Sequence, residues 1–313
     1  MHIPAIGSRN ASIGFAGGFN KLTKEYVESN SKDLLFKVVP FRMRDGINDK
    51  GLVVSMNVVP TDKGKNKSVP SVSLEKELCG EMVVRFILDN FATAQQAAEY
   101  IRDYVSIYFS IGTHQSGFEY HWMVADATDT YLIEVIDNSN VISQINNHPY
   151  MTNFYLSDVT LNDDGTVYTP ATQTESENAM DTNNITEYGS GLERYNLMNS
   201  SYENIEDETS MINLMKSLYY THAYNTSSQP ADPYWYTEFV GNDLTCASPT
   251  ASFDGIIQYA GNAFIHRERS TPLTWQTTHT AVYNIEDKSL SFTVQENETL
   301  YSRECSHQYV VWG

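Results

Sequence analysis

The sequence predicts an α+β fold in a single domain that spans residues 1–313. Short apolar runs of strand length come first, two helical patterns follow, and further strands, helices and a closing hairpin complete the chain. Long polar loops separate these segments, and few of them have the strand–helix–strand spacing that builds a parallel sheet. The expected architecture is therefore layered, with antiparallel sheets covered by helices.

Eight mostly apolar runs have the length of strands. They are residues 34–39, 52–59, 121–125, 131–136, 141–145, 151–156, 278–284 and 290–295. The polar residues 42–51 are expected to form a turn between the first two runs. The three runs between residues 121 and 145 are expected to pair as an antiparallel meander, and the last two runs as a hairpin.

Four segments repeat apolar side chains every three or four residues, which predicts helices. They are residues 74–87, 94–105, 192–198 and 211–218. Glu75 and Glu77 would lie in the first turn of the first helix, where the helix dipole favours anions. Thr93 and Gln96 have the capping-box spacing before the second helix, and Thr209 is the expected cap of the last one.

Composition and targeting signals argue against several classes of protein. Asp and Glu number 39 against 20 Lys and Arg, and the formal net charge is −19. A nucleic-acid partner is not expected, because phosphate contacts need a basic surface. No apolar run approaches the roughly 18 residues of a membrane span. The first ten residues lack the basic start and apolar run of a secretory signal, which favours a soluble, cytoplasmic protein.

Common catalytic and metal-binding motifs are absent from the sequence. There is no HExxH motif and no Cys/His cluster, and His114 and His121 stand seven residues apart. No metal or other cofactor is therefore expected. The GxSxG motif of serine hydrolases is absent as well. Three cysteines, Cys79, Cys246 and Cys305, are too few and too far apart for a disulfide framework.

Three polar side chains interrupt apolar segments. Asn57 lies within VVSMNVV, Asn153 lies within MTNF, and Arg194 lies between Leu192 and Tyr195 of a predicted helix. A buried amide must find hydrogen-bond partners or face a cavity. Two alternatives stay open for Asn57: it has such partners, or it lies on an edge strand and points to water.

These segments resemble, in order, motifs of the choloylglycine hydrolase and penicillin V acylase family and of the related acyl-CoA:isopenicillin-type acyltransferases. The matching stretches are DGINDKGLVVSMNVVP (45–60), RFILDNFATAQQAAEYI (85–101), HWMVADATDTYLIEV (121–135), YMTNFYL (150–156), GSGLERYNLM (189–198) and HTAVYNIEDKSLSFTV (279–294). The ordered set carries the resemblance, since no single motif is decisive.

The resemblance implies a four-layer αββα sandwich of two stacked antiparallel sheets, the fold of N-terminal-nucleophile hydrolases that cleave linear amides. In that family an N-terminal cysteine attacks the amide carbonyl, and its own α-amine is the general base. By motif, Asn57 matches the Asn after the first Gly-Leu strand, Asn153 the Asn that orients the oxyanion or substrate, and Arg194 the arginine that organises the site. A small-molecule amide is the expected partner, and the resemblance makes a homo-oligomer possible.

The family's cysteine and its following Gly-Arg-Asn-x-Asp segment have no match in these 313 residues. Arg9 and Asn10 echo part of it, but ASIG at residues 11–14 resembles a later family segment that enters a strand. The sequence therefore favours the body of an amidase whose nucleophile and first strands are missing from the chain. One alternative is an inactive relative that binds a small molecule. Another is an ordinary α+β binding domain, in which Asn57, Asn153 and Arg194 would lie scattered.

Overall fold

The computed structural model describes thirteen stretches of the chain, and within them the predicted α+β fold is confirmed. The stretches are residues 2–16, 39–60, 76–109, 118–136, 139–167, 192–218, 220–224, 236–240, 253–259, 262–267, 274–276, 279–294 and 308–311. Residues 34–38, Glu75, His114, Cys246 and Cys305, which figure in the sequence predictions, lie outside these stretches.

The largest sheet has seven strands in the order β1-β2-β3-β4-β7-β8-β9, and all neighbouring strands are antiparallel. Its strands are β1 (His2–Ile3), β2 (Ser12–Ala16), β3 (Met43–Asn48), β4 (Val53–Pro60), β7 (Phe118–Ala125), β8 (Thr130–Ile136) and β9 (Ser139–Gln144). Strands β7 to β9 form the predicted meander. Strand β4 lies at the centre of the sheet, between β3 and β7.

Helices α3 (Val83–Asn90) and α4 (Ala94–Tyr104) cover one face of this sheet. Alternate side chains of the central strands meet them, among them Met56 of β4 and Trp122 of β7, and all belong to one buried apolar cluster. Because side chains of a strand alternate between faces, the neighbours Asn57 and His121 point to the opposite face. That second face carries the polar groups described below.

The opposite face, at the β2–β3 end, packs against a second antiparallel sheet. That sheet contains β15 (His279–Asn284), β16 (Ser289–Val294) and β17 (Gln308–Val311), and β15 and β16 form the predicted hairpin. Leu290 packs with Ile13 and Ile47 between the two sheets. The Tyr283 hydroxyl donates a hydrogen bond across the same interface to Asp45, and burial beside this carboxylate raises the pKa of Tyr283 well above its usual value.

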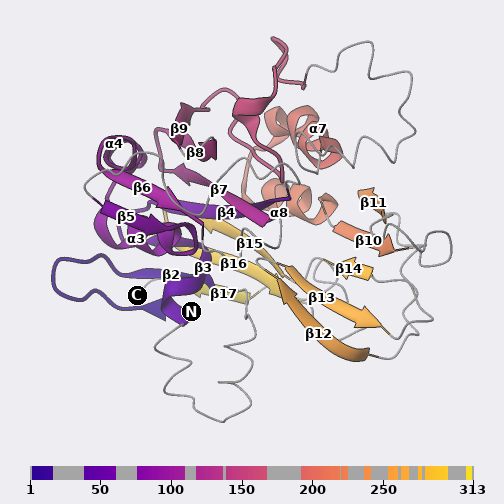
Figure 1. Ribbon diagram of the computed structural model, residues 1–313, viewed down its shortest axis with the longest axis horizontal. Helices are drawn as coiled ribbons and strands as arrows, with labels where there is room; N and C mark the ends of the chain where they lie inside the picture. The colour runs from indigo at the N-terminus through magenta and orange to yellow at the C-terminus, as the bar shows by residue number, and fades with distance from the viewer. Residues whose placement is uncertain are drawn as a thin grey trace.

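Helix α8 (Glu208–Ser217) covers the outer face of the second sheet, where the Ser291 hydroxyl donates to Glu208. The order of layers is thus helix, sheet, sheet, helix. Figure 1 shows helices α3 and α4 beside the large sheet, and α8 next to β15. A further sheet has five strands in the order β11-β10-β14-β13-β12. Its strands are β10 (Tyr220–Tyr224), β11 (Tyr236–Val240), β12 (Phe253–Tyr259), β13 (Asn262–Arg267) and β14 (Thr274–Gln276). No helix of the described residues is long and apolar enough to span a bilayer.

The predicted turn over residues 42–51 is wrong for its first part, because Met43–Asn48 form the paired strand β3. The turn is confined to the residues around Gly51, whose φ of 86° favours glycine. The Asn48 side chain closes this turn by accepting hydrogen bonds from the N–H groups of Lys50 and Leu52, at 3.0 Å each. Pairing with strands on both sides thus outweighs the polar composition of the segment.

Two details of the predicted helices are also wrong. Lys76–Cys79 form strand β5, which pairs in parallel with β6 (Val105–Tyr108), and the helix begins only at Val83 after a short 3₁₀ turn, η2 (Gly80–Met82). The last helix is capped by Asp207 and not by Thr209, since the Asp207 carboxylate accepts from the Ser210 N–H at 2.7 Å. The predicted Thr93 cap is confirmed, because its hydroxyl accepts from the Gln96 N–H at 3.3 Å.

Asp126, in the turn between β7 and β8, fastens helix α4 to the sheet. Its carboxylate accepts from the N–H of Ala94 at 2.7 Å, of Thr128 at 2.8 Å and of Asp129 at 3.0 Å. Burial raises the pKa of Asp126, but these hydrogen bonds outweigh it and leave the pKa below its usual value. The ionised carboxylate is therefore part of the folded structure.

Replacing Asp126 by alanine is expected to lower the free energy of unfolding by about 1–2 kcal/mol at pH 7. Because folding lowers the pKa of this group, its stabilisation is complete above the unfolded value of about 3.9 and is lost as pH falls through the folded value. Urea unfolding of the wild type and Asp126→Ala at neutral and acid pH measures the difference, with Asp163→Ala on an exposed turn as the control. A difference that stays constant down to about pH 2.5 would contradict the carboxylate's assigned role.

Candidate functional site

Asn57 lies on the central strand β4, so the alternative of an edge strand facing water is wrong. Its cross-strand partner on β7 is His121, and both side chains point to the inner face of the large sheet. The Asn57 Nδ2 donates to the backbone carbonyl of Thr152 at 3.0 Å. A long-range contact of this kind fixes the amide and brings the segment around residue 153 onto the strand.

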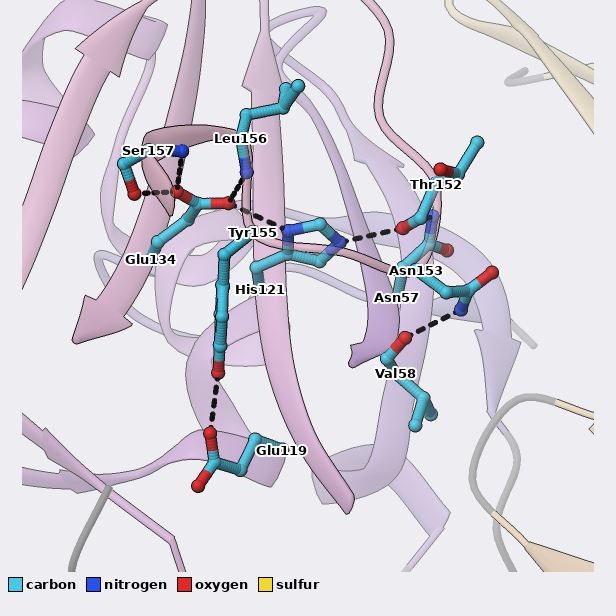
Figure 2. Close-up of polar contacts among 10 residues, drawn as sticks. All are labelled: Asn57, Val58, Glu119, His121, Glu134, Thr152, Asn153, Tyr155, Leu156 and Ser157. Atoms are coloured by element: carbon cyan, nitrogen blue, oxygen red, sulfur yellow. Dashed lines mark hydrogen bonds and ion pairs between the residues drawn. The ribbon is translucent and has the colours of Figure 1, made fainter. Parts of the chain in front are cut away.

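Asn153 and Arg194 meet at the same place. The Asn153 Nδ2 donates to the carbonyl of Val58 at 2.6 Å, and its Oδ1 accepts from the Arg194 guanidinium, on helix α7 (Leu192–Ser201), at 2.9 Å. A guanidinium only donates and a carbonyl only accepts, so this pair of bonds sets which end of the amide is nitrogen. Asn57 and Asn153 therefore lie side by side, each bonded to the backbone next to the other (Figure 2).

The three predicted site residues are thus brought together by one short network and are not scattered. An amide nitrogen carries two hydrogens, and each recorded bond uses one of them. Asn57 and Asn153 can each still direct an N–H at a further acceptor, such as a carbonyl oxygen of a ligand. With the Arg194 cation one bond away, this constellation can stabilise negative charge on an oxygen atom.

Residues 151–156 were predicted to form a fourth strand, which is wrong: they form an irregular segment that continues into a 3₁₀ turn, η3 (Leu156–Asp158). Side chains satisfy much of its backbone in place of a neighbouring strand. The Thr152 carbonyl accepts from Asn57 and faces the His121 Nε2 at 2.8 Å, while Glu134 accepts from the N–H of Leu156 at 2.8 Å and of Ser157 at 2.9 Å. The apolar character of the segment reflects burial between the sheet and α7.

His121 and Glu134 were not among the predicted site residues, although both lie in the stretch that resembles the family. Both residues are 0% exposed, and the His121 Nδ1 is 3.1 Å from the Glu134 Oε1. The Ser157 hydroxyl also donates to Glu134 (Figure 2). A histidine and a glutamate at inner-face positions of two paired predicted strands were the signal that could have marked them.

Glu119 adds a third buried ionisable group to the same face of β7. Its Oε2 accepts from the Tyr155 hydroxyl at 2.8 Å, and the Tyr155 ring packs edge-on against His121 with the ring centres 5.9 Å apart. Burying such groups is expensive unless they are hydrogen-bonded. Their concentration on one face makes that face of the sheet the candidate site.

Cys79 does not belong to this constellation. It ends strand β5, and its thiol lies 3.8 Å from the Glu81 carboxylate. Burial raises the pKa of the Cys79 thiol, which keeps it protonated and a poor nucleophile. The described part of the chain holds no group of three or more His, Cys, Asp or Glu side chains placed to bind a metal ion.

A pocket of about 490 Å³ lies between β8, β9, η3 and α7, within the size range of small-molecule sites. Its wall includes Leu132, His148, Tyr195 and, from the irregular segment, Leu156 and Ser157. The last two residues also donate to Glu134. A ligand in this pocket would therefore touch the segment that carries Asn153.

Comparisons with known proteins agree with this architecture. The sequence profile of the family described as acyl-coenzyme A:6-aminopenicillanic acid acyl-transferase matches residues 34–230, which is more than half of the chain. No curated protein sequence matches this chain.

Among solved structures, a mutant conjugated bile acid hydrolase from Clostridium perfringens has a TM-score of 0.51 at 12% identity, over 98% of this chain and 78% of that chain. A second variant of that hydrolase gives 0.49 at 12% identity, over 98% and 83%. Penicillin V acylase from Agrobacterium tumefaciens gives 0.42 at 14% identity, over 87% and 67%.

At 12% identity the likeness to the bile acid hydrolase concerns the fold, and it confirms the N-terminal-nucleophile hydrolase fold that the sequence resemblance implied. The family match confirms the resemblance itself, which included the acyltransferase branch. The chain therefore belongs to the acyl-coenzyme A:6-aminopenicillanic acid acyl-transferase family.

Proposed function

We propose that this chain is the body of a linear-amide C–N hydrolase of the bile acid hydrolase or penicillin V acylase type, whose N-terminal cysteine lies outside these 313 residues. The observation that carries the proposal is the convergence of Asn57, Asn153 and Arg194 on the inner face of the large sheet. These are the positions that the family motifs assign to the site, and they come from strand β4, an irregular segment and helix α7, which are far apart in the sequence.

In the proposed reaction the cysteine sulfur attacks the amide carbonyl while the α-amine takes the thiol proton. The carbonyl oxygen becomes negatively charged in the tetrahedral intermediate, and N–H groups of Asn57 and Asn153 donate to it. Arg194 holds the Asn153 amide by its oxygen, so that the nitrogen faces the site. The protonated amine then gives its proton to the leaving nitrogen, and water hydrolyses the resulting thioester.

A second candidate reaction is acyl transfer to an amine, favoured by the family whose profile matches the chain. The chemistry up to the thioester is the same, and an amine replaces water as the group that accepts the acyl chain. The proposed roles of Asn57, Asn153 and Arg194 do not differ between the two reactions, since both pass through an oxyanion.

A third candidate is an inactive relative that binds a small molecule. It is favoured by the position and chemistry of Cys79, because the one cysteine in the described part of the chain is no candidate nucleophile. In such a protein the pocket and the polar network would serve only to bind the small molecule.

The test begins with the coding sequence directly upstream of the chain, which is searched for a cysteine followed by Gly-Arg-Asn-x-Asp. The segment that begins with this cysteine is then joined to the chain. With that cysteine exposed as the first residue, the extended protein is expected to release a primary amine from penicillin V or from a glycine-conjugated bile acid. Supplying 6-aminopenicillanic acid with an acyl-coenzyme A separates transfer from hydrolysis.

The matched control is the same extended protein with that cysteine replaced by alanine. No turnover in a folded, correctly processed protein would reject both enzyme candidates. Saturable binding of penicillin V or the bile acid by the 313-residue chain, measured by calorimetry, would then support the binding protein.

A further inference from the structure

The buried pair His121 and Glu134 lies at the centre of the contacts that hold residues 152–157. His121 stands on β7 and Glu134 on the neighbouring strand β8. The His121 Nε2 faces the Thr152 carbonyl at 2.8 Å, at the start of the segment. Glu134 accepts from Leu156 and Ser157 at its end. The pair therefore reaches both ends of the stretch that contains Asn153.

Hydrogen-bond chemistry fixes where the protons of this pair lie. The Thr152 carbonyl can only accept, so the His121 Nε2 carries a hydrogen. Glu134 receives the N–H of Leu156 on one oxygen and both the N–H and the hydroxyl of Ser157 on the other. The Glu134 Oε1 also faces the His121 Nδ1 at 3.1 Å, so one hydrogen lies between the ring and the carboxyl group, and the two side chains are joined by a hydrogen bond in the interior.

Stability alone does not explain such a pair, because replacing both partners of a buried hydrogen bond by apolar side chains of the same shape can be nearly neutral or stabilising. Its geometric effect is specific. The Thr152 carbonyl accepts from His121 and Asn57 together, so the pair sets the position of the Asn57 amide through one shared acceptor. It sets the position of Asn153 because that residue follows Thr152 directly and its amide must reach the Val58 carbonyl.

We propose that the hydrogen-bonded pair His121 and Glu134 is the positioning element of the site: it clamps residues 152–157 at both ends and so aims the Asn57 and Asn153 amides at one point. The other ionisable groups around the ring are Glu119, two residues along β7, Tyr155, whose ring packs on it, and Arg194, which acts through Asn153. Neither His121 nor Glu134 is assigned contact with substrate. The kinetic part of the test rests on the proposed function, while the spectroscopic part does not.

The first experiment uses the 313-residue chain labelled with ¹⁵N-histidine. The His121 Nε2 is expected to carry a hydrogen that is held in a hydrogen bond to the Thr152 carbonyl. His121→Gln identifies the signal by its loss. An Nε2 that carries no hydrogen in the wild type would overturn the proposal, and this measurement requires no folded Glu134 variant.

The second experiment compares Glu134→Gln with Glu208→Gln, a matched change at another carboxylate that accepts a serine hydroxyl. In Glu134→Gln we expect at least about tenfold faster hydrogen exchange at the N–H of Leu156 and Ser157, and shifted side-chain amide signals of Asn57 and Asn153. Glu208→Gln should leave all of these unchanged. Unchanged exchange and amide signals in Glu134→Gln would overturn the clamp.

The third experiment uses the extended, cysteine-bearing enzyme. Glu134→Gln is expected to lower kcat about 10–100-fold with KM within about twofold, because small misplacement of catalytic groups affects the chemical step most. His121→Gln, which can still donate to Thr152, should retain more kcat than His121→Ala. An unchanged kcat in Glu134→Gln would overturn the positioning role. If the extended wild type has no activity, the proposed function fails and the spectroscopic results still decide the clamp.

Discussion

Replacing Asn153 by alanine is expected to lower kcat of the extended, cysteine-bearing enzyme by about 10²–10³-fold, the usual effect of removing one oxyanion donor. The structure gives two reasons for an effect of this size. The Asn153 amide is held at both ends, by Val58 and by Arg194, so its remaining N–H has a fixed direction. Its removal also leaves the Arg194 guanidinium without this acceptor.

Asn153→Asp separates the role of the side chain as a hydrogen-bond donor from its role as the acceptor for Arg194. The aspartate can still accept from Arg194, but it cannot donate to Val58 or to a developing oxyanion, and its charge opposes the oxyanion. We therefore expect it to be at least as damaging to kcat as alanine. Asn162→Ala, at an exposed position where the side-chain amide donates to Thr166, is the control that should keep full activity. Steady-state kinetics showing a loss confined to KM would contradict the oxyanion assignment and indicate ground-state binding.

The site could be predicted from the sequence where polar residues interrupt apolar runs. Asn57 in β4 and Asn153 in MTNF are conspicuous because an amide inside an apolar segment needs a partner. The identity of that partner could not be read, since Thr152 lies 95 residues from Asn57 and contributes only its backbone carbonyl. Backbone acceptors carry no side-chain signal, so the network that joins the predicted residues is a property of the fold.

His121 and Glu134 could not be predicted as site residues for a related reason. Alternation along β7 and β8 shows that they point away from the apolar neighbours Trp122 and Ile133, but it does not show what covers their face. A solvated face and a face covered by residues 152–157 have the same pattern. Only the tertiary structure distinguishes a surface pair from one that is fully buried.

The fold itself was predictable wherever local pattern and tertiary pairing agree, as in the meander and in helix α4. It was not predictable where pairing partners are distant. Lys76–Cys79 were assigned to a helix because Leu74 and Leu78 have helical spacing, but pairing with β6 holds them extended. A strand of four residues has little stability by itself and depends on pairing with its neighbour. The periodicity of a single sequence does not show that such a partner exists.

The helix-facing core of the large sheet contains Trp122, the largest fully buried side chain among the described residues. Its side chain is 0% exposed in the middle of β7, and its ring stacks on Phe109 with the ring centres 6.2 Å apart and an interplanar angle of 6°. A Cβ added at Gly80 would lie 3.0 Å from the Phe109 ring and 3.3 Å from the Trp122 ring, so these groups are packed closely against the β5 end. Little room exists for them to relax if the indole is removed.

Trp122→Ala is therefore expected to lower the free energy of unfolding by about 3–5 kcal/mol, a large part of the 5–15 kcal/mol typical of a domain. Trp122→Phe should cost much less, under about 1.5 kcal/mol, for two reasons. It keeps a ring against Phe109, and it removes a buried indole N–H that has no hydrogen-bond partner among the described residues. Urea unfolding followed by far-ultraviolet circular dichroism measures both. Equal losses in the two variants would show that the indole N–H has a partner and that the stacked ring is not the main source of the stability.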